Sequence, residues 1–197
     1  MSKVVILYIF FSFSCFASQA IKNDIEKEFK IKVRDYATFD FGRDKNHSAI
    51  SFMVAENLSK FTLVKVRALI PKGYLAYIGT TRDLSDEQTK GHEVVVIHSD
   101  DKFDILRTAQ SNGLNFNLTT KLVIDKLQKW DELYDIDIWQ AETDTIQLKL
   151  KTLPKNITRL SHEIYKFCPD IVDQGSGDIN DISSYLKDSK QIYLWWD

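Results

Sequence analysis

Cys168 is the residue of this sequence with the strongest potential nucleophile, because its thiol can ionise to a thiolate. Catalysis by Cys168 would need a histidine within hydrogen-bond reach. His162 lies six residues earlier, which places it on a different face of a helix. The sequence has two cysteines, and Cys15 lies in an N-terminal segment that we expect to be removed. The single cysteine left is more often a small buried hydrophobe, so we interpret Cys168 as structural. The catalytic alternative is a hydrolase-like site that gathers His98, Asp100, Cys168 and Asp170 from distant segments.

A second group of polar residues follows the apolar run Val94–Ile97. His98, Asp100 and Asp101 stand where a buried strand is expected to end, and ligands often bind at such strand ends. Ser99 or Asp100 can also cap the helix that follows, and capping is the commoner role of an Asp-rich turn. We therefore expect no metal and no cofactor here, and we retain the three residues as binding candidates.

A third candidate site lies in the C-terminal segment. Asp170, Asp173 and Gln174 fall between two expected helices, and Gly175 and Gly177 beside them permit unusual backbone conformations. Loops held by a rigid scaffold often bind partners. The alternative is that these side chains only cap turns.

Two adjacent tryptophans complete the candidate binding residues. Trp195 and Trp196 lie in an expected strand and must point to opposite faces. One is expected in the core and the other at the surface or in a groove. The sequence contains no nucleotide-binding glycine loop, serine nucleophile elbow or zinc-binding helix.

Composition narrows the function classes further. The chain has 197 residues, 26 basic and 28 acidic side chains, and a net charge of −2. Nucleic-acid binding normally requires a basic excess, so no nucleic-acid partner is expected. Only 7 glycines and 3 prolines argue against long linkers.

The N-terminus has the pattern of a secretory signal peptide. Lys3 precedes an apolar stretch of thirteen residues, Val4–Phe16, which is too short to span a bilayer as a helix. Small residues follow, so we expect cleavage after Ala20 and a periplasmic or secreted protein with no remaining membrane span. A lipoprotein anchored at Cys15 is less favoured, because Ser12 replaces the usual aliphatic residue.

The mature chain, 21–197, is predicted to form one α+β or mixed α/β domain, with a twisted mixed sheet and packed helices. Residues 57–69 fit a helix or a strand equally, while 39–48 and 82–91 are expected to be loops. A buried strand is expected at 94–97 and an alternating strand at 145–150. Helices are expected at 21–29, after 99–101 with its end at Asn112–Gly113, from Thr119 or Thr120 through Tyr134, after Pro154, and at 179–186.

The C-terminal third resembles the uncharacterised bacterial family called domain of unknown function 4253. The resemblance spans about Pro71–Asp197 and depends mainly on the segments Tyr165–Gly175 and Tyr193–Asp197, which contain CPDIVDQG and YLWWD. Weaker matches lie at Asp104–Leu106, Asn112–Gly113, Thr119–Thr120 and Lys129–Asp131. The resemblance implies a fold and candidate positions but no reaction. Family members often look cytosolic, so the export signal is a departure from the family pattern.

These observations favour a small exported binding protein over an enzyme. The mildly acidic surface suits a protein partner, such as a basic antibacterial effector that an immunity protein neutralises in the periplasm. The alternatives are the envelope hydrolase described above and a ligand-sensing envelope protein. The sequence does not determine the oligomeric state.

Overall fold

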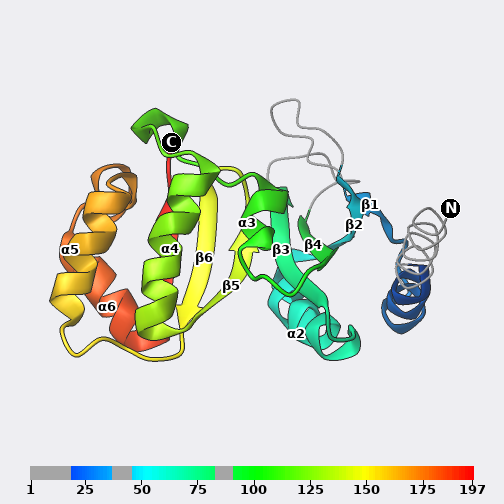
Figure 1. Ribbon diagram of the computed structural model, residues 1–197. Helices are drawn as coiled ribbons and strands as arrows, with labels where there is room; N and C mark the ends of the chain where they lie inside the picture. Colours follow the sequence, from blue (N-terminus) through cyan, green and yellow to red (C-terminus); the bar gives the residue numbers. More distant parts are fainter. Residues whose placement is uncertain (1–18, 37–45, 83–90) are drawn as a thin grey trace, which may run out of the picture.

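Seven strands form one mixed sheet in the computed structural model, which describes residues 19–36, 46–82 and 91–197 (Figure 1). The spatial order of the strands is β1-β2-β4-β3-β5-β6-β7, and only the β3–β5 pair is parallel. The strands are β1 (Arg34–Tyr36), β2 (Asn46–Val54), β3 (Tyr74–Arg82), β4 (Gly91–His98), β5 (Ile136–Ala141), β6 (Thr145–Leu150) and β7 (Gln191–Trp195).

Two strands confirm their sequence patterns directly. The continuous apolar run in β4 is buried on both faces of the sheet. In β6, Ile146, Leu148 and Leu150 are buried, while Gln147 and Lys149 between them point to the opposite face. This alternation follows from the two-residue period of a pleated strand.

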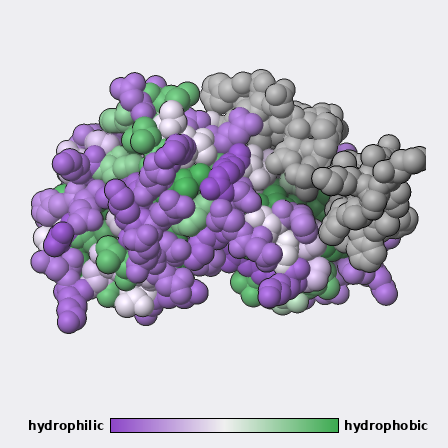
Figure 2. Space-filling view, in the orientation of Figure 1, coloured by the Kyte–Doolittle hydropathy of each residue, from purple (hydrophilic) through white to green (hydrophobic). Residues whose placement is uncertain are grey.

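Helices pack on both faces of the sheet, and Figure 2 shows that the face carrying α4 is mostly hydrophilic. The ambiguous segment 57–69 is helical, because Leu63 and Val66 are buried against the sheet. The helix over residues 19–29 is unlabelled in Figure 1. The labelled helices and turns are η2 (Glu56–Leu58), α2 (Ser59–Leu69), α3 (Asp104–Ala109), η3 (Leu114–Phe116), α4 (Thr120–Tyr134), α5 (Ile157–Phe167), η4 (Ile171–Ser176) and α6 (Ile179–Ser189).

The hydrophobic core has one layer on each face of the sheet. Trp130 of α4 and Ile164 of α5 belong to the first layer, on the face covered by α3, α4, α5 and α6. Ile25 and Val66 belong to the second layer, under the 19–29 helix and α2. β4 contributes alternate side chains to both layers, so the sheet joins them into one α+β fold.

Two details of the region around α3 differ from the sequence predictions. The N-cap residue of α3 is Phe103, which makes no side-chain capping bond. In the turn before it, Asp101 Oδ1 accepts a hydrogen bond from Phe103 N at 2.9 Å, and Ser99 Oγ accepts one from Asp101 N at 2.9 Å. The helix ends at Ala109, because Gln110 adopts a left-handed conformation with φ of 55°. It therefore ends before the predicted Asn112–Gly113 stop.

Several sequence predictions fall on parts of the chain that the structure does not describe. The predicted signal peptide lies outside the described residues up to position 18, and the predicted loops 39–48 and 82–91 lie largely outside them. Among the residues that are described, no helix is both long and apolar enough to cross a bilayer.

Candidate functional site

The C-terminal tryptophans sit on opposite faces of the chain, as their adjacency predicts. Trp196 is only 3% exposed, and its Nε1 donates a hydrogen bond to Phe167 O at 3.3 Å. The Phe167 ring packs edge-to-face on Trp196 and also on Trp130. Trp195, by contrast, is half-buried on the other side. Trp196 is therefore a core residue, and only Trp195 has a side chain within reach of a ligand.

Asp170 holds the end of the chain in place. It is 5% exposed, and its Oδ2 accepts a hydrogen bond from Asp197 N at 3.0 Å. The Asn115 side chain donates a hydrogen bond to the carbonyl of Asp197. Gly113 lies against the Trp196 ring, where an added Cβ would come within 2.9 Å of Cγ. Residues 113–115 and Asp170, which are far apart in the sequence, thus contact and hold the last two residues, Trp196 and Asp197.

Cys168 blocks the free edge of β7. Its Sγ donates a hydrogen bond to Trp195 O at 2.9 Å and accepts one from Trp195 N at 3.2 Å. Burial raises the pKa of the Cys168 thiol to about 12. Because nucleophilic attack requires the thiolate, a buried thiol with this pKa is inert near neutral pH. The geometry supports the structural interpretation of this cysteine.

Asp173 and Gln174 of the C-terminal motif are exposed on η4, the predicted irregular stretch, which forms one wide helical turn. Asp173 Oδ1 accepts a hydrogen bond from Tyr165 OH at 2.9 Å, and this bond raises the pKa of Tyr165. Gln174 is exposed, and its side chain has no hydrogen-bond partner among the described residues. Neither side chain faces a cavity with the buried members of the motif.

The candidates after β4 lie at the opposite end of the sheet. His98 packs edge-to-face on Tyr74, with ring centroids 4.8 Å apart. Asp101 accepts a hydrogen bond from Phe103 N in the turn before α3 and forms an ion pair with Arg107 at 2.7 Å, while Asp100 is exposed.

The proposed hydrolase site of His98, Asp100, Cys168 and Asp170 is therefore not assembled. β4 and β7 run in opposite directions, so their C-terminal ends lie at opposite ends of the sheet. Strands β3, β5 and β6 also lie between them. Within the described part of the chain, no cluster of three His, Cys, Asp or Glu side chains is placed to hold a metal ion.

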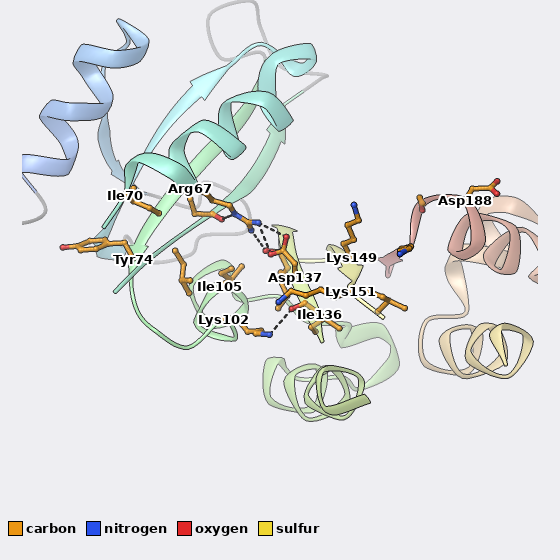
Figure 3. A pocket seen from close by; sticks show the side chains of 16 residues that line it. Arg67, Ile70, Tyr74, Lys102, Ile105, Ile136, Asp137, Lys149, Lys151 and Asp188 are labelled. Carbon is orange, nitrogen blue, oxygen red and sulfur yellow. Dashed lines mark hydrogen bonds and ion pairs between the residues drawn. The ribbon is translucent and has the colours of Figure 1, made fainter. Parts of the chain in front are cut away.

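A large groove, which the sequence did not reveal, lies among the described residues. It encloses about 910 Å³ where β3 and β5 separate at their N-terminal ends (Figure 3). The parallel pair is joined at Ile78 and Gln140, whereas Ala76 and Ile138 are bridged by a side chain instead.

Arg67 of α2 is that bridge. Its Nε donates a hydrogen bond to Ala76 O and its Nη2 donates one to Ile138 O, both at 2.8 Å. Its Nη1 binds both carboxylate oxygens of Asp137, at 2.8 and 2.9 Å. On the far wall, Lys102 Nζ donates hydrogen bonds to Asp131 and to Ile136 O. Arg67 thus links β3 and β5 where they separate, and Lys102 binds the start of β5.

The groove continues onto a face of β5, β6 and β7 that no described helix covers. α2 packs mainly on β3 and β4 and forms a wall beside this face. Lys60 of α2 lies over the Trp139 ring, 4.5 Å from its centroid. Gln147 Nε2 donates a hydrogen bond to Gln140 Oε1 at 2.8 Å, and Lys149 stands further along β6. The polar positions of β6 indicated this open face in the sequence, but nothing marked Arg67 as the bridge.

The fold is of the α+β class, and Cys168, Asp170 and Trp196 of its C-terminal motif are buried and hydrogen-bonded. The family model of domain of unknown function DUF4253 matches residues 93–197, and the chain belongs to this family. The match begins within β4, not at the expected Pro71. Searches of curated proteins and of solved structures gave no match.

Proposed function

We propose that this protein is an exported, non-catalytic binding protein that neutralises an antibacterial effector in the periplasm. The observation that carries the proposal is the contrast between its two polar regions. Cys168 and Asp170 are buried and hydrogen-bonded to the backbone, whereas the groove beside Arg67 is open and large. An open surface on a rigid sheet suits recognition of another macromolecule.

Export is the second part of the proposal. It is supported by the sequence pattern at positions 1–20, with Lys3, an apolar stretch and small residues before Ile21. A protein that acts outside the cytoplasm can meet an effector delivered by a neighbouring cell before the effector reaches its target.

The test is competition between sister cells. A strain that lacks the gene is grown against its parent, and the same pair is grown with a parent that cannot deliver effectors. We expect the deletion strain to be outcompeted only by the delivering parent. The full-length gene should restore survival, whereas a copy that lacks residues 2–20 should not, because its product stays in the cytoplasm.

Two results would contradict the proposal. Equal survival of the deletion strain against both parents would exclude the immunity role. Full rescue by the copy without residues 2–20 would exclude the periplasm as the place of action.

A further inference from the structure

The surface around the groove carries an excess of positive charge, although the whole chain has a net charge of −2. Three of its cations are neutralised within the protein: Arg67 by Asp137, Lys102 by Asp131, and Lys151 by Asp135. Three others, from α2, β6 and the end of α6, have no carboxylate partner among the described residues: Lys60, Lys149 and Lys190.

Few acidic side chains balance these three lysines. Asp137 is already paired with Arg67, so Asp188 is the one groove-lining carboxylate without an ion pair within the described ranges. Such a local excess attracts an anionic partner and favours its productive orientation.

An apolar strip borders the charged surface. Phe61 and Val64 on α2 are 60% and 67% exposed, and Val64 lines the same concave face as Lys60, Arg67 and Lys149. Exposed apolar side chains beside a groove are typical of protein interfaces. Together with the amide side chains of Gln140 and Gln147, they favour a polypeptide as the anionic partner.

We infer that the groove surface, defined by Lys60, Val64, Arg67, Lys149 and Lys190, docks an acidic polypeptide segment of the partner. This inference rests on the proposed function, since it names the chemistry of the surface that the binding protein would cover. It reverses the sequence-based expectation of a basic partner, because the concave surface differs in charge from the chain as a whole.

The test uses a fluorescent peptide of ten glutamates as the probe and a peptide of ten lysines as its counterpart. We expect saturable binding of the acidic peptide only, measured by fluorescence anisotropy and weakened by added salt. Amide NMR shifts on titration should map to β6, to the end of α6 and to α2.

A matched pair of variants separates the groove from net charge. The double variant Lys149→Glu/Lys190→Glu should weaken binding by about tenfold or more. The control Lys129→Glu/Lys166→Glu makes the same change in net charge on α4 and α5, and it should change the affinity less than about twofold. All four lysines are exposed, so both variants should retain the wild-type circular dichroism spectrum.

Three outcomes would overturn the inference: no binding of the acidic peptide, NMR shifts confined to another face, or equal loss of binding in both variants. A wild-type dimer that becomes monomeric in Lys149→Glu/Lys190→Glu would also overturn it, because the surface would then bind a second copy. Peptide binding requires no effector. If the peptide binds but the deletion strain is not sensitised, the docking surface stands and the immunity role fails.

Discussion

At the scale of single residues, Cys168 shows how a reactive type of side chain becomes a structural one. Its thiol satisfies both backbone groups of Trp195 at the edge of β7, on the side where this strand pairs with no other described strand. An unpaired strand edge is prone to unwanted pairing with other chains. The cysteine therefore protects the end of the sheet.

This burial predicts a specific loss of stability at alkaline pH. The thiol pKa is 9.0 when unperturbed and about 12 in the folded protein, so the unfolded chain releases the proton first. The stabilising contribution is complete below about pH 9 and declines by about 1.4 kcal/mol per pH unit up to about pH 12. Between about pH 8 and pH 10, the free energy of unfolding should fall about 1.4 kcal/mol more in the wild type than in Cys168→Ala, measured by urea denaturation. Equal pH dependence in both proteins would contradict this account.

Gly113 gives a second prediction at the same scale. A Cβ at this position would lie 2.9 Å from Cγ of the Trp196 ring, and that ring is fixed by Phe167. Gly113→Ala should therefore lower the free energy of unfolding by about 1–3 kcal/mol, as measured by urea denaturation.

The matched control for Gly113 is Gly175→Ala in the same C-terminal cluster. Its added Cβ would meet Asp170 O at an ordinary distance of 3.5 Å, so the change should stay within about 0.5 kcal/mol. Equal effects of the two substitutions would show that the Trp196 contact does not limit residue size at position 113.

At the scale of elements, the junction of β3 and β5 depends on a helix. Arg67 in α2 binds carbonyl groups of both strands where they no longer pair directly. The planar guanidinium can donate several hydrogen bonds in fixed directions, which a lysine ammonium on a flexible stem cannot reproduce. The groove therefore exists because one side chain replaces part of the β ladder.

Arg67→Lys should destabilise this junction more than the rest of the fold. We expect a loss of about 1–3 kcal/mol and faster amide hydrogen exchange in the N-terminal halves of β3 and β5. The control is Arg159→Lys, since the Arg159 side chain is 79% exposed and its ion pair within the described residues is with Glu163; this change should alter stability by less than about 0.5 kcal/mol. Unchanged exchange in Arg67→Lys would show that the strands are held by other contacts.

At the scale of the whole molecule, the two core layers share one sheet and should unfold together. Leu127→Ala in the layer under α4 and Leu63→Ala in the layer under α2 should each cost about 2–5 kcal/mol. Each should shift one common transition, followed by circular dichroism and by tryptophan fluorescence, because Trp130 and Trp139 report on different layers. The exposed Leu133→Ala is the control. Two separate transitions would contradict a single domain.

The sequence by itself determined the features that depend on local periodicity. The 19–29 helix, the buried stripe of α4, the doubly buried run in β4 and the alternation in β6 all appear where their patterns predict them. These features can be predicted because the helical period of 3.6 residues and the strand period of two residues determine which side chains share a face. The family resemblance in the C-terminal third had the same origin, since it depends on a contiguous motif.

Tertiary structure alone decided which distant residues meet. Strand order placed His98 and Cys168 at opposite ends of the sheet, and it brought Gly113, Asp170 and Asp197 around Trp196. Strand order depends on how helices and strands pack across both faces, and no local period encodes it. The groove could not be predicted from the sequence for the same reason. Arg67 binds Ala76 O in β3 and Ile138 O in β5, and these two strands are far apart in the chain.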